Sequence, residues 1–140
     1  MKTEILQFSN STVSITVIDN LIYIKVSGVY DDTLALTLIK HLDPLIDELS
    51  VDPIRVWDAS DIPVGEFKLT GLCIKKISAW AKNIKFKRPD SKSFMIAPSP
   101  ISFGMARMYE SISNLDDTGV IVLHRLDELP ASIREKIQFE

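Results

Sequence analysis

The segment from residue 94 to residue 110 constrains the fold of this chain more than any other part. Its apolar run ends at Pro98, Ser99 stands where a helix N-cap is expected, and Pro100 fits the first helical position. Apolar side chains then recur at helical spacing, at Ile101, Met105, Met108, Tyr109 and Ile112. A strand that leads directly into a helix is the repeating unit of α/β proteins, so this segment predicts the α/β class.

The rest of the hydrophobic pattern divides into further strands and helices. Strands are predicted at residues 13–17, 22–26, 54–57, 93–97 and 120–124, with a short strand at 4–8. Helices are predicted from Asp31 or Asp32 to Leu49, over about 66–83, after Ser99, and over 126–137. Asp19 and Asn20 fit a two-residue hairpin turn, and Pro44 is expected to kink its helix or to separate the last turn.

These elements predict one α/β domain that spans residues 1–140. Short strands that alternate with helices imply parallel pairing with right-handed crossovers, and the opening hairpin makes the sheet mixed. A chain of 140 residues that is 46% hydrophobic is long enough to bury a substantial core.

The sequence contains no segment that predicts a membrane span or export. No apolar run approaches the roughly 20 residues that a membrane span needs, and residues 1–10 do not resemble a secretory signal. Cys73 is the single cysteine, so it cannot form an internal disulfide, and we expect it to be a buried hydrophobic side chain. We therefore expect a cytoplasmic protein.

Three short segments, taken in order, resemble the SpoIIAA-like proteins of the STAS group, which is named after sulfate transporters and anti-sigma-factor antagonists. They are Gly28–Asp32, which ends a strand before a long helix; Val56–Ser60, a strand with a terminal aspartate; and Phe103–Tyr109, followed by a strand and Leu126–Glu128. The resemblance covers about residues 11–137. It implies a mixed sheet of four to five strands with helices mainly on one face, a homodimer, and a binding or regulatory role without catalysis. The likeness of this branch to lipid-carrying SEC14-type domains implies a small apolar ligand.

One feature of the anti-sigma-factor antagonists is missing at its expected place. In those proteins a phosphorylatable serine follows the aspartate-ended strand, at the N-terminus of the next helix. Counted from Asp58, this turn falls near residues 66–68, where no hydroxyl residue stands; Ser60 comes too early and Thr70 lies past the turn. The sequence therefore argues against a phosphorylation switch of that kind.

The sequence has no recognisable catalytic or metal-binding motif. His41 and His124 lie far from any nucleophile motif, and the histidines and the cysteine lack zinc-ligand spacing. The five glycines form neither a dinucleotide-binding loop nor a phosphate-binding loop. Asp58, Asp61 and Glu66 follow a strand and could hold a hard cation, although a solvated loop is the more common arrangement. We therefore expect no catalysis, no cofactor and no metal.

Positive charge is concentrated in one short segment of an otherwise acidic protein. Residues 68–92 hold eight of the sixteen basic side chains and one acidic side chain, although the net charge is −3. The inner face of the helix predicted there carries Leu69, Leu72, Cys73, Ile77, Trp80 and Ile84. Its outer face and flank carry Lys68, Lys75, Lys76, Lys82 and Lys85. Such a helix either packs on the sheet with solvated lysines or binds an anionic membrane surface.

Two functional hypotheses follow from these features. The first is a module that binds a small apolar ligand and associates peripherally with membranes through the lysines named above. Its ligand-binding residues would be Trp57, Leu69, Leu72, Ile77, Trp80 and Phe103. The second is a STAS-type regulatory domain that binds a protein partner. Nucleic-acid binding is not expected, because the chain is acidic overall and the basic segment lacks interleaved aromatic residues.

Overall fold

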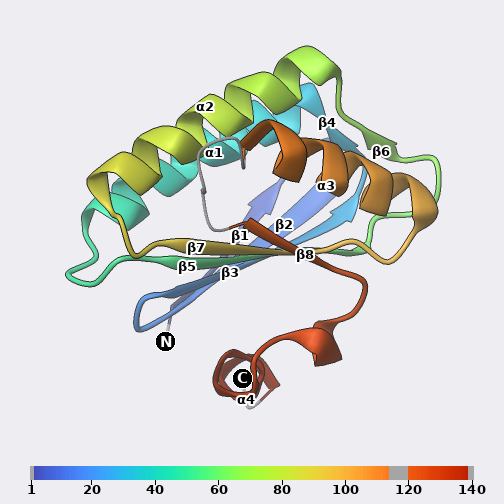
Figure 1. Cartoon of the computed structure of the whole chain (residues 1–140). Helices are drawn as coiled ribbons and strands as arrows, with labels where there is room; N and C mark the ends of the chain where they lie inside the picture. The colour runs from blue at the N-terminus through green and yellow to red at the C-terminus, as the bar shows by residue number, and fades with distance from the viewer. Residues whose placement is uncertain (1, 114–119, 139–140) are drawn as a thin grey trace.

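The computed structural model describes residues 2–113 and 120–138, and its centre is a mixed sheet (Figure 1). The strand order in this six-stranded sheet is β1-β2-β3-β5-β7-β8. The strands are β1 (Lys2–Gln7), β2 (Ser11–Ile18), β3 (Leu21–Gly28), β5 (Ile54–Asp61), β7 (Lys92–Ile96) and β8 (Val120–Leu123). The first three strands pair antiparallel and the others pair parallel. The predicted mixed sheet is confirmed, with six strands where the resemblance implies four to five. The short strand predicted at residues 4–8 is β1, which pairs with β2 along its whole length.

Helices cover both faces of the sheet, but most of them lie on one face. In the described residues they are α1 (Asp32–Asp47), α2 (Gly71–Lys87), α3 (Pro100–Ser113) and α4 (Ala131–Gln138). Figure 1 shows α1, α2 and α3 above the sheet and α4 alone below it. A second, two-stranded sheet joins β4 (Tyr30–Asp31) to β6 (Phe67–Lys68). The prediction of helices mainly on one face is confirmed.

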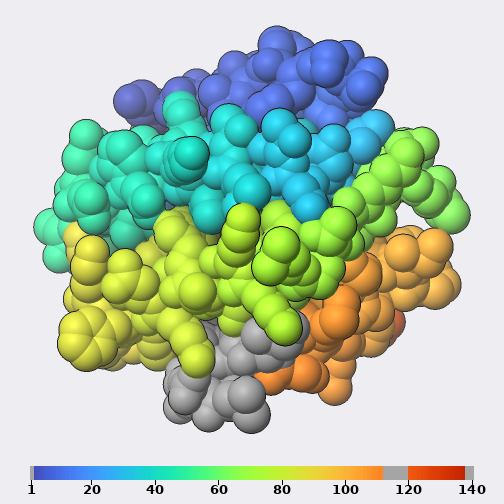
Figure 2. Space-filling view, turned by 90° about the horizontal axis from the view of Figure 1, so that it is seen from above, coloured from blue at the N-terminus to red at the C-terminus, as the bar shows by residue number. Residues whose placement is uncertain are grey.

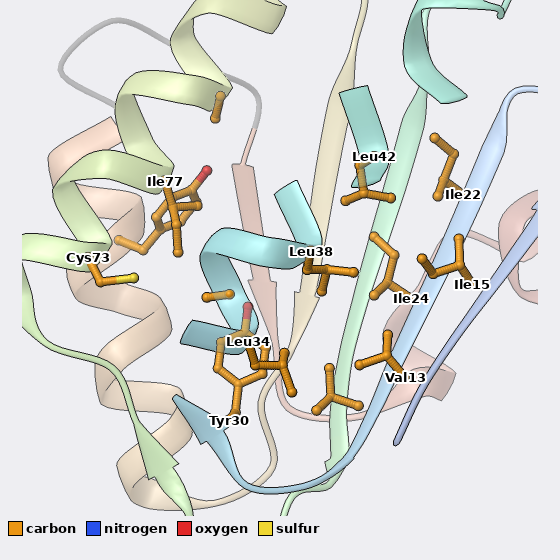
Figure 3. Packing of buried hydrophobic residues seen from close by; sticks show 14 of the residues in the cluster. Val13, Ile15, Ile22, Ile24, Tyr30, Leu34, Leu38, Leu42, Cys73 and Ile77 are labelled. Carbon is orange, nitrogen blue, oxygen red and sulfur yellow. The ribbon is translucent and has the colours of Figure 1, made fainter. Parts of the chain in front are cut away.

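Each face of the sheet carries its own hydrophobic core. Under α1, the side chains of Leu34, Leu38 and Leu42 point toward alternate residues of β2 and β3 (Figure 3). Under α4, Val56 and Phe94 of the sheet pack with residues that include Leu129 and Ile133. The central parallel strands are therefore buried on both faces, as is usual for parallel pairing.

The turn and cap signals of the sequence are confirmed. Asp19 and Asn20 join β2 to β3, and Asp19 has the positive φ of 55° that such a turn requires. The Asp31 carboxylate caps α1 by accepting a hydrogen bond of 2.9 Å from a first-turn amide. The Ser99 hydroxyl accepts a hydrogen bond of 3.0 Å from the amide of Ser102 at the start of α3.

Several predicted boundaries are wrong. β5 continues to Asp61, so the chain is still in the sheet where a loop is predicted. α1 continues across Pro44 to Asp47, because a proline so near the C-terminal end removes only one backbone hydrogen bond and the flanking apolar residues remain buried. The last helix begins at Ala131, and Leu126–Glu128 forms a separate 3₁₀ turn before it.

The helix predicted over residues 66–83 is also misplaced. It begins at Gly71, because Phe67 and Lys68 form the strand β6, and it continues to Lys87. The predicted inner face is also wrong in part, because Leu72 is 66% exposed. The buried side of α2 instead includes Ile74 and the small residues Ser78 and Ala81.

The inner face predicted for α3 is correct only in part. Tyr109 is buried and Met105 is half-buried against the core, whereas Ile101 and Met108 are exposed. The buried side instead includes Ser102 and Ala106. The side chain of Ile112, the fifth predicted member, lies outside the described residues.

Candidate functional site

The C-terminal ends of β3 and β5 meet the N-terminal end of α2 at one edge of the molecule. In open α/β sheets the ends of parallel strands are where ligands bind, so this edge is the candidate site. The pairing of β4 with β6 holds the loop of residues 62–66 against the start of α1. The backbone amide of Tyr30 donates to the carbonyl of Glu66 at 2.9 Å, and the Tyr30 and Phe67 rings stack at 5.3 Å.

The loop of residues 62–66 presents an apolar tip to solvent. Ile62 is buried and anchors the start of the loop, and Gly65 adopts a φ of 88° near its end. Between them the Val64 side chain is 81% exposed. An exposed aliphatic side chain at the tip of an anchored loop is suited to contact with another protein.

Thr70 is a residue of the site that the sequence reasoning misplaced. It is the N-cap of α2, and its Oγ1 accepts a hydrogen bond from the amide of Cys73 at 3.2 Å. The same hydroxyl donates to Asp32 Oδ2 at 2.6 Å, and the Thr70 amide donates to Asp32 Oδ1 at 2.9 Å. A hydroxyl residue therefore does stand at the N-terminus of the helix after the aspartate-ended strand, and its absence, inferred by counting along the sequence, is wrong.

The Asp32 carboxylate ties the start of α1 to the start of α2. No acidic side chain lies in the first turn of α2, so Asp32 supplies negative charge to that helix end from a neighbouring helix. The hydrogen bonds from the hydroxyl and the amide of Thr70 hold the pKa of Asp32 below its ordinary value of 3.8.

Asp32→Asn is expected to reduce the acid sensitivity of folding. Because the folded state lowers the pKa of Asp32, the unfolded state binds the proton more tightly. The contribution of Asp32 to stability is therefore complete above pH 3.8 and is lost as the pH falls below that value. Urea unfolding from neutral to strongly acidic pH should show a smaller stability difference between wild type and Asp32→Asn as the pH falls. A difference that stays constant over this pH range would contradict this account.

A small apolar cavity lies behind the site, between the sheet and the helices. Its volume is about 70 Å³, and its lining includes Tyr30, Trp57, Phe67, Leu69, Ile77 and Met105. A dry cavity of about 150 Å³ is known to accommodate benzene. In this conformation the cavity is therefore too small for a lipid chain.

The cavity brings together only some of the predicted ligand-binding residues. Trp57, Leu69 and Ile77 line it, whereas Leu72 points to solvent. Trp80 does not line the cavity; its ring packs edge-on against Trp57, and its indole Nε1 donates to Asp43 of α1 at 2.6 Å. Phe103 stacks on His124 with ring centroids 3.9 Å apart. The six residues therefore do not form one site.

The predicted lysine surface is likewise divided. Lys75, Lys76 and Lys82 are exposed on α2. Lys85 is half-buried and donates to the carbonyl of Ser91 at 3.1 Å, and Lys68 lies on β6 at 3.5 Å from Glu66. In residues 2–113 and 120–138, no helix is both long enough and apolar enough to cross a bilayer.

The three carboxylates considered as cation ligands have separate partners. Asp58 is buried and accepts hydrogen bonds from the hydroxyls of Tyr23 and Ser60. Asp61 pairs with Lys25 at 3.3 Å, and Glu66 pairs with Lys68. Within the described parts of the chain, no group of three or more His, Cys, Asp or Glu residues could hold a metal ion. Burial, with help from the hydrogen bond to Asp58, raises the pKa of Tyr23, so its hydroxyl remains a donor.

Two further groups with a shifted pKa are buried, the guanidinium of Arg55 and the thiol of Cys73. Arg55 on β5 is only 2% exposed, and its guanidinium lies 5.1 Å from the centre of the Trp80 ring. Burial lowers the pKa of Arg55. Burial also raises the pKa of the Cys73 thiol to about 11, so this cysteine is a protonated core side chain at neutral pH.

Comparison with known proteins yields a structural match. No protein-family model matches the chain, and no curated protein matches it in sequence. Among solved structures, the chain is similar to the crystal structure of an anti-sigma factor antagonist from Mycobacterium paratuberculosis. The match has a TM-score of 0.55 and 21% sequence identity, and it covers 89% of this chain and 94% of that chain. Together with the strand order and the helices on one face, this match shows that the chain has the SpoIIAA/STAS-like fold that the sequence resemblance implies.

Proposed function

We propose that this protein is a STAS-type regulatory domain that acts by binding another protein and not by catalysis. The observation that carries the proposal is the structural similarity to an anti-sigma factor antagonist, which extends over 89% of this chain. By analogy with the name of that protein, the class of partner that we expect is an anti-sigma factor. The proposed contact surface consists of the loop of residues 62–66, β6 and Thr70.

The apolar-ligand hypothesis has less support from the geometry. A cavity of about 70 Å³ would have to enlarge several-fold to hold a lipid chain. Three of the six residues predicted to bind the ligand lie away from this cavity. An exposed apolar tip beside a helix N-terminus is better suited to a protein surface than to a small ligand.

The position of Thr70 supports regulation of this surface by phosphorylation. A phosphate on Oγ1 would add about 1.5 to 2 negative charges and would remove the proton that the hydroxyl donates to Asp32. The new charge would then lie beside the Asp32 carboxylate, which would repel it. We therefore expect phosphorylation of Thr70 to separate the starts of α1 and α2 and to weaken partner binding.

Thr70→Glu, which adds negative charge at this position, is expected to abolish partner capture. Immobilised wild type, Thr70→Ser, Thr70→Glu and Val64→Asp would be incubated with lysate of the native host, and the retained proteins would be quantified by mass spectrometry. One partner should be retained by wild type and by Thr70→Ser, because serine keeps the cap and both hydrogen bonds. Its retention should fall at least tenfold with Thr70→Glu and with Val64→Asp.

Thermal unfolding of each variant separates loss of binding from loss of folding. Thr70→Glu should remain folded, because replacement of an N-cap costs only about 0.5–2 kcal/mol. Equal retention of the same proteins by all four variants would refute the assigned surface. Retention of nothing but this protein itself would refute the proposed function.

A further inference from the structure

A buried arginine lies between the sheet and α2 without an ionic partner among the described residues. Arg55 of β5 is 2% exposed, and its Nε and Nη1 atoms have no hydrogen-bond partner there. Burial lowers the pKa of Arg55, and no carboxylate of residues 2–113 or 120–138 counteracts this effect. Because a guanidinium is not deprotonated in proteins, its positive charge remains in the core. An unpaired buried charge is strongly unfavourable, so this position calls for a negative charge.

A second polar side chain without a partner in the described structure lies beside Arg55. The strands β5 and β7 pair in parallel, and Arg55 and Ser93 are partners in their register. Side chains of register partners lie on the same face of a sheet. Ser93 is 1% exposed, and its hydroxyl, like the guanidinium, has no hydrogen-bond partner in the described part of the chain. Two neighbouring strands thus supply hydrogen-bond donors to one buried layer beneath α2.

Space for a small guest exists within reach of these donors. Trp57 and Met95 follow Arg55 and Ser93 by two residues on the same strands, so all four side chains share one face of the sheet. Both Trp57 and Met95 line the apolar cavity of about 70 Å³. The Arg55–Ser93 pair therefore lies about 7 Å along the strands from the cavity wall, which an arginine side chain can span. A water-sized guest needs only about 10–15 Å³ of such a cavity.

The indole ring of Trp80 covers the guanidinium from the side of α2. The ring centre lies 5.1 Å from Cζ of Arg55, and the same ring meets the ring of Trp57 at 6.4 Å between centroids. Asp43 of α1 accepts a hydrogen bond of 2.6 Å from the indole and holds it in this position. Figure 2 shows α1, in blue-green, and α2, in green to yellow, side by side over this layer. A side chain of another protein could therefore reach Arg55 only by displacing Trp80, whereas a free ion is small enough to enter through brief local opening.

We propose that Arg55 and Ser93 bind a small monovalent anion, of the size of chloride or nitrate, beneath Trp80. The unpartnered N–H groups of Arg55 and the hydroxyl of Ser93 supply its hydrogen-bond donors, and its charge neutralises the guanidinium. A water molecule could accept the same hydrogen bonds, but it would leave the positive charge uncompensated. A divalent anion such as sulfate is disfavoured, because one guanidinium neutralises only one of its two charges.

Unfolding of the full chain in urea at fixed ionic strength tests the proposal. Sodium gluconate, whose anion is too large for the site, is replaced stepwise by sodium chloride. An ion that binds only the folded state stabilises it by mass action. The unfolding equilibrium constant of wild type should fall at least tenfold when chloride reaches about 100 mM, which corresponds to a dissociation constant of about 10 mM.

Three variants separate binding at this site from a general effect of salt. Arg55→Met removes the charge but keeps a long side chain, so its stability should not depend on the exchange of anions. In gluconate it should be at least as stable as wild type, because it lacks the uncompensated buried charge. Ser93→Ala should raise the chloride concentration that gives half of the effect about tenfold, because one hydrogen bond to the anion is lost. Arg107→Met is the matched control, since it removes one arginine from an exposed ion pair with Glu110 and should respond to chloride as wild type does.

Bromide, a halide of similar size, locates the site directly and needs no variant that folds. Anomalous diffraction from wild-type crystals grown in sodium bromide should place an ion in contact with the Arg55 guanidinium and the Ser93 hydroxyl. Equal responses of wild type and Arg55→Met to chloride, or no response of wild type, would overturn the proposal, as would bromide found only elsewhere. Bromide at the site without a chloride response in solution would show binding at crystal concentration only and would overturn it too. The inference does not depend on the proposed partner-binding surface, and either proposal can fail without the other.

Discussion

Gly28→Ala is expected to lower the free energy of unfolding by about 3–5 kcal/mol, although the substitution removes no existing contact. Gly28 ends β3 with a φ of 99°, outside the region that alanine readily adopts. A Cβ at this position would lie 2.4 Å from the backbone oxygen of Asn10, which accepts a hydrogen bond from the amide of Val29. Neither backbone can move without breaking the end of the β2–β3 ladder. Urea unfolding of the two proteins measures the difference.

Gly65→Ala is the matched control, because it isolates the effect of the positive φ. Gly65 has a similar φ of 88°, but a Cβ there would meet no atom within 4 Å. We therefore expect a loss of only about 1 kcal/mol. Equal losses for the two variants would show that the contact with Asn10 contributes nothing and that backbone strain alone explains the requirement for glycine at residue 28.

The parts of the fold that depend on neighbours in sequence could be predicted. The hairpin turn at Asp19 and Asn20, the Asp31 cap and the Ser99 cap all use side chains within three residues of the backbone that they satisfy. The alternation of apolar residues in β2 and β3 likewise reflects one buried face. These signals were sufficient for the mixed sheet and for the order of its helices.

The start of α2 could not be predicted, because distant residues determine it. Phe67 and Lys68 leave the helical path to pair with Tyr30 and Asp31, more than thirty residues earlier in the chain. Asp32 then holds Thr70 as the N-cap. The helix also buries small residues such as Ser78 and Ala81, so its inner face does not stand out in a pattern of large apolar residues.

The candidate site was predicted only in part for the same reason. Trp57 and Ile77 belong to regular elements, and their inward faces could be inferred from periodicity. Thr70 carries an N-cap signal, since it is a threonine three residues before the buried run that begins at Cys73. A search for caps before every apolar run would have found it. The tip at Val64 carries no such signal, because only the packed structure determines which apolar residues lack partners.

Ile74→Ala is expected to lower the free energy of unfolding by about 2–5 kcal/mol, whereas Leu72→Ala should change it by no more than about 0.5 kcal/mol. Ile74 is 1% exposed and packs in the core between α2 and the sheet, so its truncation enlarges an existing cavity. Leu72, two residues earlier on the same helix, is 66% exposed. Urea unfolding of the two variants and of wild type measures both values.

This pair of variants distinguishes the predicted inner face of α2 from the observed one more sharply than any single substitution. The inner face that the sequence pattern predicts contains Leu72 together with Leu69. Leu72→Ala would then cost as much as a core truncation. A small loss for Leu72→Ala beside a large loss for Ile74→Ala instead shows that the inner face of the helix contains Ile74 and that Leu72 lies outside it. The same result leaves Leu72 on the exposed side of α2, where Lys75, Lys76 and Lys82 also lie.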